Sequence, residues 1–261
     1  MDILETIVEN KRRELLLREE FPPIPEAGKK RRSLREALLR SESGIIAEFK
    51  RKSPSKAWIH ENISPENVVP LYEKGGAAAL SILTDAEFFG GELRYIARMR
   101  PIVDIPILRK DFIIDPVQID DAFAAGADAV LLIAACLTKE ECALLTKKAH
   151  SKGLEVLLEV HSPKELDYIQ EDTDVVGVNN RNLGTFITDV GNSFSMAPLI
   201  KGRFRALGVS RPVMISESGI SSPETVRQLR KEGFRGFLMG ENFMKREDPG
   251  KALKEFITSL Q

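Results

Sequence analysis

From Gly44 onward, short apolar segments alternate with segments of helical character, and this alternation limits the fold more than any other feature of the chain. Most of the apolar segments are nearly continuous runs, which is typical of parallel strands whose outer face is covered. Strict alternation of strands and helices implies a parallel sheet, and right-handed crossovers leave few topologies. The eight predicted strands are Ile45–Lys50, Ala79–Thr84, Ile107–Lys110, Ala129–Ile133, Glu155–Val160, Val175–Asn179, Val213–Glu217 and Gly236–Met239.

Residues typical of helix ends separate these strands. A capping Ser, Thr or Asp precedes proline or an acidic first turn at Ser64-Pro65-Glu66, Asp115-Pro116, Thr138-Lys139-Glu140-Glu141, Ser162-Pro163 and Ser222-Pro223-Glu224. Glycines that can end a helix stand shortly before the next strand at Gly75-Gly76, Gly126, Gly153 and Gly233.

Eight strand–helix units fit a closed (β/α)8 barrel, the TIM barrel of the α/β class, whose usual length is about 250 residues. The alternative is an open doubly wound sheet, which would carry a glycine-rich dinucleotide turn after its first strand. That position holds Lys50-Arg51-Lys52-Ser53-Pro54-Ser55 instead. We therefore predict a barrel over residues 44–261.

Residues 1–43 differ from the rest and are predicted to form an N-terminal helical extension packed on the barrel. Apolar residues recur at helical spacing from Ile3 to Leu16, and Pro22-Pro23-Ile24-Pro25 ends that helix. The basic run Lys29-Lys30-Arg31-Arg32 is interpreted as a solvated face before a second helix around Leu34–Leu39, in preference to a nucleic-acid patch.

Composition excludes several classes of protein. The 261 residues are 43% hydrophobic with a formal net charge of −1, which argues against disorder and against a dedicated nucleic-acid binder. The longest apolar run, Ala129–Leu137, is far shorter than the roughly 20 residues that span a bilayer. Since the N-terminus lacks the order of a signal peptide and Cys136 and Cys142 give no disulfide framework, we expect a cytoplasmic protein without nucleic-acid or membrane partners.

Ionisable residues stand where the predicted strands end. Glu48 and Lys50 share a face of the first strand, Lys110 closes the third, Glu159 lies near the end of the fifth, Asn179 ends the sixth and Glu217 the seventh. Each alone could be a solvent-facing tip or a structural ion pair. Together they fall at the C-terminal ends of the strands, where barrel enzymes place their chemistry, and so predict a group of acid and base partners.

Two glycine-containing turns follow the last two strands, Ser216-Glu217-Ser218-Gly219-Ile220 and Met239-Gly240-Glu241-Asn242. In this fold the loops at these two positions commonly hold a phosphate through backbone N–H groups. A phosphorylated small-molecule ligand is therefore expected. Because a carboxylate repels phosphate, we expect Glu241 to contribute its backbone N–H and to turn its side chain away.

No metal site is predicted. His60, His150 and His161 are scattered, and no set of His, Cys and Asp has the spacing of metal ligands. The three histidines are interpreted as solvated or structural residues.

Eight stretches of the chain resemble the indole-3-glycerol phosphate synthase family, in order from the first strand to the eighth. They are IIAEFKRKSPS (Ile45–Ser55), ALSILTDAEFFGG (Ala79–Gly91), PILRKDFIIDPVQI (Pro106–Ile119), GADAVLLIAA (Gly126–Ala135), GLEVLLEVH (Gly153–His161), VGVNNRNL (Val176–Leu183), SESGI (Ser216–Ile220) and FLMGENFM (Phe237–Met244). The resemblance implies a barrel whose N-terminal extension lies over its mouth. It also implies an enzyme of tryptophan biosynthesis that closes the indole ring of 1-(2-carboxyphenylamino)-1-deoxy-D-ribulose 5-phosphate, with loss of carbon dioxide and water and without metal or organic cofactor.

The resemblance also implies roles for the residues. Lys110 would donate a proton to the ketone, Lys50 would position anionic groups, and Glu159 would assist loss of the hydroxyl, while the division of steps between the two lysines stays open. Glu48 would hold Lys50, Asn179 and Glu217 would bind hydroxyls, and Arg181 would lie near an anionic group. The phosphate would be bound by Ser53, Ser218, Gly219, Gly240 and Glu241, and the anthranilate ring would be enclosed by Phe89, Phe112, Leu131 and Leu183.

Lys56-Ala57 departs from the family pattern after the first strand, and Ser216 replaces a more usual alanine before Glu217. Two other functions fit the residues less well. A phosphoribosylanthranilate isomerase would carry a cysteine at the end of the first strand, where this chain has Glu48-Phe49-Lys50. A non-catalytic phosphate-binding barrel would not need Lys50, Lys110 and Glu159 together. Association with other enzymes of the pathway is left open.

Overall fold

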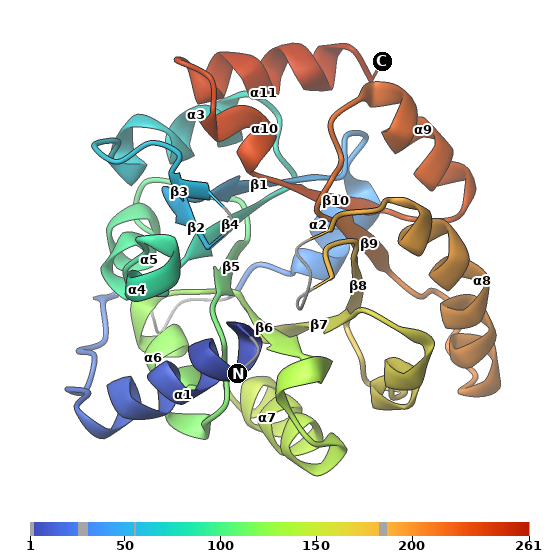
Figure 1. Ribbon diagram of the computed structural model, residues 1–261, viewed down its shortest axis with the longest axis horizontal. Coiled ribbons are helices and arrows are strands. Elements are labelled where there is room, and N and C mark those ends of the chain that lie inside the picture. Colours follow the sequence, from blue (N-terminus) through green and yellow to red (C-terminus); the bar gives the residue numbers. More distant parts are fainter. Residues whose placement is uncertain (1–2, 26–30, 55, 183–186, 261) are drawn as a thin grey trace.

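The computed structural model describes residues 3–25, 31–54, 56–182 and 187–260 of the chain. In these ranges eight parallel strands form a closed barrel in the order β1-β10-β9-β8-β7-β6-β5-β4, with helices around it (Figure 1). The predicted (β/α)8 barrel is therefore confirmed. Its strands are β1 (Ile45–Phe49), β4 (Ala79–Leu83), β5 (Ile107–Lys110), β6 (Ala129–Ile133), β7 (Glu155–Val160), β8 (Val175–Asn179), β9 (Met214–Glu217) and β10 (Gly236–Met239).

Helices connect the strands on the outside of the barrel, as Figure 1 shows. The α-helices of the barrel are α3 (Val69–Lys74), α4 (Ala86–Phe89), α5 (Leu93–Met99), α6 (Pro116–Ala125), α7 (Lys139–Ser151), α8 (Gly191–Ala206), α9 (Pro223–Lys231), α10 (Glu241–Met244) and α11 (Pro249–Thr258). Short 3-10 helices are η2 (Pro65–Asn67), η3 (Ala134–Cys136) and η4 (Pro163–Tyr168).

Local sequence signals explain where these helices begin. Asp115 and Thr138 each close a capping box with the residue three positions later, which satisfies backbone N–H groups at the first turns of α6 and α7. The expected helix at Ser162-Pro163 is only the 3-10 helix η4, at whose start the Glu165 carboxylate accepts the backbone N–H of His161 and the Ser162 hydroxyl. A small hairpin of β2 (Lys52–Ser53) and β3 (Lys56–Trp58), which the sequence did not suggest, follows β1.

Side chains on each strand alternate between the inside and the outside of the barrel. Buried residues inside it include Ile46, Leu108, Leu131, Leu157 and Ile215, which form one apolar cluster. Residues on the other face of the strands pack against the surrounding helices in a second, larger cluster. Glu48, Lys110, Glu159 and Glu217 each stand two positions after an inward apolar residue, so the strands direct all four into the barrel near its C-terminal end.

The N-terminal extension divides between the two ends of the barrel. Helix α1 (Ile3–Leu16) lies at the C-terminal mouth, where Lys11 forms ion pairs with Asp85 after β4 and Asp111 after β5. Helix α2 (Leu34–Arg40) closes the opposite end, since Leu34 and Leu38 are buried in the inner cluster. Of these two helices, only α1 lies at the mouth of the barrel.

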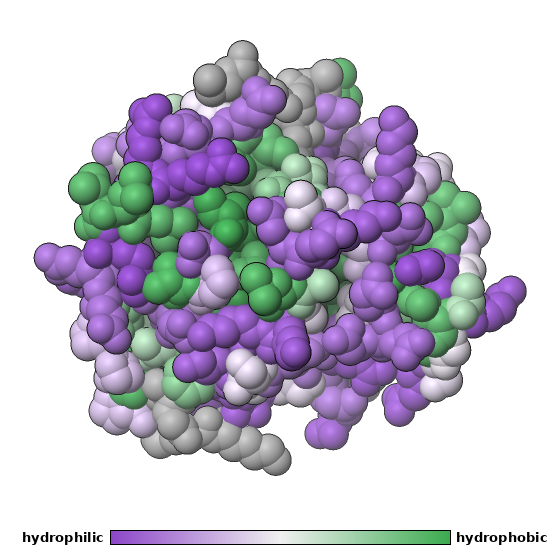
Figure 2. Space-filling model, turned by 90° about the horizontal axis from the view of Figure 1, so that it is seen from below, coloured by the Kyte–Doolittle hydropathy of each residue, from purple (hydrophilic) through white to green (hydrophobic). Residues whose placement is uncertain are grey.

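The surface seen from below in Figure 2 is mainly hydrophilic, with separate groups of hydrophobic side chains between the charged ones. Among the described residues, no helix combines the length and the apolar character that a bilayer-spanning segment requires.

Candidate active site

A cavity of about 490 Å³ opens at the C-terminal end of the barrel, beneath α1. Fourteen of the predicted site residues line it: Glu48, Lys50, Phe89, Lys110, Phe112, Leu131, Glu159, Asn179, Arg181, Glu217, Ser218, Gly219, Gly240 and Glu241. Two others are not among its lining residues. Ser53 is buried in β2, and Leu183 lies outside the residues that the structure describes.

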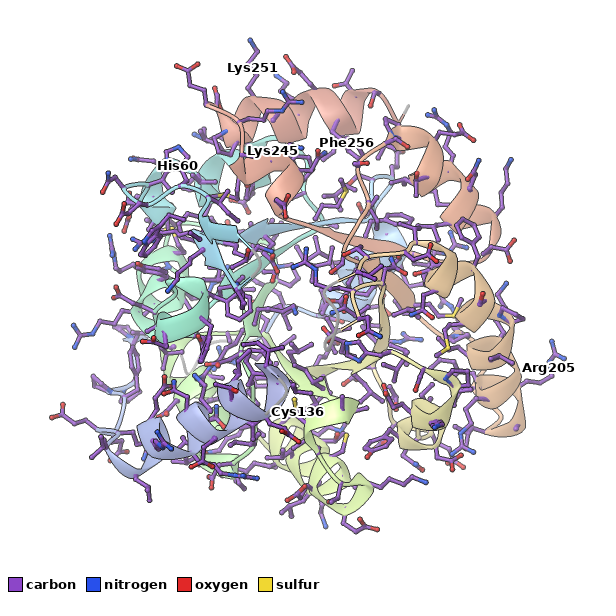
Figure 3. All side chains as sticks on the ribbon, viewed as in Figure 1. His60, Cys136, Arg205, Lys245, Lys251 and Phe256 are labelled. Carbon is purple, nitrogen blue, oxygen red and sulfur yellow. The ribbon has the colours of Figure 1, made fainter. Side chains whose placement is uncertain are left out.

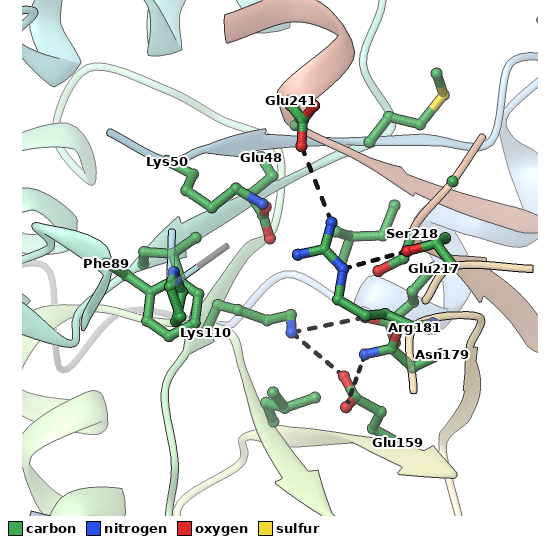
Figure 4. A pocket seen from close by; sticks show the side chains of 18 of the residues that line it. Glu48, Lys50, Phe89, Lys110, Glu159, Asn179, Arg181, Glu217, Ser218 and Glu241 are labelled. Atoms are coloured by element: carbon green, nitrogen blue, oxygen red, sulfur yellow. Dashed lines mark hydrogen bonds and ion pairs between the residues drawn. The ribbon is translucent and has the colours of Figure 1, made fainter. Parts of the chain in front are cut away.

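Lys110 extends across the floor of this cavity toward two carboxyl groups (Figure 4). Its Nζ donates a hydrogen bond to Glu159 Oε2 at 3.3 Å and lies 3.7 Å from Glu217 Oε2. Burial disfavours the charged lysine, but the charges of Glu159, Glu217 and Glu48 outweigh it and raise the pKa of Lys110 above its usual value. Lys110 is thus a cation enclosed by acidic groups.

Glu159 and Glu217 share this cation but do not carry the same charge. Burial alone would raise the pKa of Glu159, yet Lys110, His161 and Asn179 lower it below its ordinary range. Burial and the nearby charge of Glu159 raise the pKa of Glu217 to about 8. Glu159 is therefore the ionised member of the pair at neutral pH and Glu217 the protonated one, so that the site contains a base and an acid side by side.

A second ion pair lies at the C-terminal end of β1, between Glu48 of the strand and Lys50 just after it. Lys50 Nζ is 2.8 Å from Glu48 Oε1, and Ser81 Oγ donates to Glu48 Oε2 at 3.4 Å. Burial opposes ionisation of Glu48, but Lys50 and then Lys110 lower its pKa nonetheless. Glu48 therefore holds the Lys50 ammonium at the edge of the cavity, which Figure 4 shows opposite Arg181.

The loops after β8, β9 and β10 form the other side of the cavity. Asn179 donates to Glu159 Oε1 at 3.1 Å, and its own Oδ1 accepts from the backbone N–H of Arg181 at 3.0 Å. Ser218 and Gly219 are consecutive left-handed residues, with φ of +67° and +77°, and they turn the chain sharply at the cavity wall. Asn180 supports this turn because its Nδ2 donates to the Ser218 carbonyl at 3.0 Å.

The side chain of Glu241 does not turn away as expected. Its Oε2 lies 3.9 Å from the Arg181 guanidinium, and the residue lines the cavity. Attraction to that cation explains the orientation, since the two side chains face each other across the mouth (Figure 4).

Apolar side chains form the remaining wall. Phe89 of α4 and Phe112 after β5 have ring centroids 6.0 Å apart, and Leu131 of β6 lies beside them in the same lining. Helix α1 adds Ile3, Leu4 and Ile7. Such a wall suits a flat aromatic ring and lowers the local dielectric around the charged groups.

Several residues of the site were missed from the sequence. The spacing of Ile3, Leu4 and Ile7 predicts an amphipathic helix but does not indicate that its apolar face lines the cavity. Lys245, four residues after Glu241 and labelled in Figure 3, adds a further cation to the lining. His161 contacts Glu159, and its position two residues later was the available signal.

The described residues contain no group of three His, Cys, Asp and Glu side chains that could hold a metal ion. His60 lies at the periphery of the molecule, as Figure 3 shows.

Comparisons with known proteins agree with this geometry. Residues 4–256 match the family model described as indole-3-glycerol phosphate synthase. A protein of that name from Bacteroides thetaiotaomicron is 52% identical over 266 residues, covering 100% of this chain and 99% of its own length. Another from Geobacillus thermodenitrificans is 41% identical and covers 96% of this chain and 95% of its own length.

A solved structure shares the fold at low sequence identity. It is a chain from work described as the structural basis of mutual activation of the tryptophan synthase a2b2 complex from the hyperthermophile Pyrococcus furiosus. Its TM-score is 0.60 at 16% identity, and the match covers 84% of this chain and 98% of that one. The family-model match over nearly the whole length and the 52% identical full-length relative establish that the chain belongs to the indole-3-glycerol phosphate synthase family.

Proposed function

We propose that Lys110 acts as the acid and Glu159 as the base of the ring-closing reaction, while other groups at the barrel mouth bind the anionic parts of the substrate. The chain is a carboxy-lyase of tryptophan biosynthesis that acts on a phosphorylated small-molecule substrate. The observation that supports our assignment of roles is the contact of Lys110 with both Glu159 and Glu217 inside one cavity with an aromatic wall.

Lys110 is the proton donor in the first step. As the aromatic carbon attacks the ketone, negative charge develops on the ketone oxygen, and a buried ammonium is suited to protonate it. Loss of carbon dioxide then restores the aromatic ring. The apolar wall of Phe89, Phe112 and Leu131 would hold that ring, and Leu183 remains a further candidate.

Glu159 is the base of the dehydration step. Loss of the hydroxyl requires a proton on the leaving oxygen and removal of a proton from the ring system. The ionised Glu159 accepts the proton from the ring system, and either Lys50 or Lys110 supplies the proton to the leaving oxygen. Asn179 and Glu217 bind the hydroxyls of the sugar-derived chain, and Glu48 keeps Lys50 in place.

Phosphate is bound at the turns that follow β9 and β10. Backbone N–H groups of Ser218, Gly219, Gly240 and Glu241 are the proposed donors, with Ser53 as a further one. Arg181 and the newly found Lys245 add positive charge on this side of the cavity and offset the carboxylate of Glu241.

We also propose a cytoplasmic location, which rests on the composition and the two free cysteines. An association with other enzymes of the pathway remains a proposal that rests on the family alone.

The roles are tested by replacing Lys110 with alanine and following indole formation by fluorescence. Turnover should fall by roughly 10²–10⁴-fold, the usual contribution of a positioned acid or base, while the protein stays folded by circular dichroism. Lys139→Ala, which removes an exposed lysine paired with Asp167 on the outer surface, is the matched control and should be fully active. Near-native turnover of Lys110→Ala would refute its assigned role.

A further inference from the structure

His161 stands directly behind the proposed base, between two carboxylates. Its Nε2 lies 3.2 Å from Glu159 Oε1, and its Nδ1 lies 3.6 Å from Glu165 Oε2. Glu165 is held in turn, because Oε2 accepts the backbone N–H of His161 at 2.6 Å and Oε1 accepts the Ser162 hydroxyl at 3.2 Å. The loop after β7 thus forms a line of carboxylate, imidazole and carboxylate that ends at Glu159.

These contacts depend on charge more than on hydrogen-bond alignment. Both ring nitrogens are buried, and neither has an aligned hydrogen-bond acceptor within the described part of the chain. An imidazole placed this way attracts two carboxylates strongly only when it carries a proton. Burial disfavours that charge, but Glu159 and Glu165 outweigh it and raise the pKa of His161 to about 10.

The other groups around Glu159 do not replace this charge. Lys110 from β5 contacts the opposite oxygen, Oε2, while Asn179 from β8 gives Oε1 a neutral donor. From β9 the neighbour is Glu217, whose pKa is raised by burial and by the charge of Glu159, so that it supplies no positive charge to Glu159. Cys136 of η3 is a neutral thiol there, because burial raises its pKa to about 12. On the Oε1 side, His161 is the cation that balances Glu159.

We infer that His161 is a positioning residue for the reaction: held by Glu165, its imidazolium keeps Glu159 ionised and turned so that Oε2 faces Lys110 and the substrate. This inference rests on the proposed role of Glu159 as the base. His161 is not among the lining residues of the cavity, so it acts through Glu159 and does not touch the substrate.

Removal of the imidazolium should make protonation of Glu159 easier. Glu159 and Glu217 titrate as a pair, and loss of a neighbouring cation raises the pH at which the pair takes up its second proton. The acid limb of the pH profile for kcat reports this protonation in the substrate complex. A purely structural histidine would change the amount of folded protein or kcat at every pH but would leave that limb in place.

The test compares His161→Gln with His150→Gln in the full chain. His150 of α7 forms a similar pair, with Nε2 2.8 Å from Asp174, but Asp174 lies away from the cavity. For His161→Gln we expect the acid limb to move up by about one pH unit or more and KM to stay nearly constant. The control should match the wild type, and an unmoved acid limb in His161→Gln overturns the inference.

A measurement independent of catalysis uses NMR titration of the three histidines in the wild-type protein. One imidazole should stay protonated well above pH 8, and its signal should be absent in His161→Gln and titrate at lower pH in Glu165→Gln. If all three histidines titrate near 6.5, the inference is wrong whether or not the variants fold.

Glu159→Gln separates this inference from the proposed function. If that variant is inactive while His161→Gln keeps the wild-type acid limb, only the role of His161 fails. If Glu159→Gln is as active as the wild type, the proposed base itself fails.

Discussion

Replacement of Lys11 by methionine should destabilise the protein by about 3 kcal/mol. The buried Lys11 ammonium lies 2.9 Å from Asp85 Oδ2 and 3.1 Å from Asp111 Oδ1, and Glu14 Oε2 is 2.7 Å away. At an effective dielectric constant of about 20, each contact near 3 Å has an attraction of roughly 5 kcal/mol before the cost of burying the charges. Breaking a buried pair from one side typically costs about 3–5 kcal/mol, because a buried charge loses its partner.

The lower end of that range applies here because Asp111 keeps other partners. Arg109 at 2.8 Å and the Thr84 hydroxyl at 2.6 Å remain bound to Asp111, whereas the Asp85 carboxylate is left, among the described residues, with the backbone N–H of Phe88 at 2.8 Å. Loss of the Lys11 ammonium therefore affects the buried Asp85 carboxylate more than Asp111. Since α1 also contributes Ile7 to the cavity wall, KM should rise together with the loss of stability.

Urea unfolding followed by circular dichroism measures the change in the free energy of unfolding. Arg12→Met is the matched control on the same helix, since its side chain is 67% exposed and its contact with Glu9 is 3.8 Å long, and it should change stability by less than about 0.5 kcal/mol. Adding Asp85→Asn to Lys11→Met should recover part of the loss, because it removes the unpaired carboxylate. If Lys11→Met and Arg12→Met are equally stable, the buried cation does not hold α1 in place.

Three further outcomes are expected. Inorganic phosphate at ten times its Kd should stabilise the protein by about 1.4 kcal/mol, and a melting temperature that responds no more to phosphate than to sodium chloride of equal ionic strength would count against the phosphate site. Gly177→Ala should lower turnover at least tenfold, because a Cβ there would collide with Glu217 Oε1, whereas Gly202→Ala in α8, with no heavy atom within 4 Å of the new Cβ, should be neutral; equal activity of the two would exclude this steric effect. Because the folded-state pKa of Glu217 is raised to about 8, its contribution to stability is fully present below pH 4 and is lost as the pH rises through 8. Glu217→Gln should therefore flatten the decline in the free energy of unfolding between pH 5 and 9. Parallel curves for Glu217→Gln and the wild type would show that Glu217 is already ionised at pH 5.

The strands of the barrel could be predicted nearly to the residue because their signal is local. An apolar run with helix signals on either side is contained in the segment itself, and period-two alternation then places Glu48 and Glu159 inside the barrel. The predicted and observed strand bounds differ by one residue at Lys50, Thr84 and Val213, where no local signal distinguishes a paired residue from the loop residue next to it.

Features that depend on distant partners could not be predicted. In the sequence, Lys11 is indistinguishable from the other charged residues of an amphipathic helix, and only the fold brings it to Asp85 and Asp111. The same holds for His161, because only the fold shows that it contacts the buried Glu159. The apolar face of α2 likewise does not indicate which end of the barrel the helix closes. The role of each predicted site residue likewise depends on a bound substrate.

The position of helix α2 has a consequence for the order in which the protein can assemble during synthesis. The ribosome makes α2 before the strands of the barrel, but the partners of α2 come much later: Arg35 binds Glu155 and the carbonyl of Arg211, and Leu38 lies beside Gly236. The apolar face of α2 therefore has no complete place to bind until the last strand has left the ribosome. Helix α2, which is translated before every strand of the barrel, is thus among the last elements to dock, and a nascent chain stalled before β10 would carry this face uncovered.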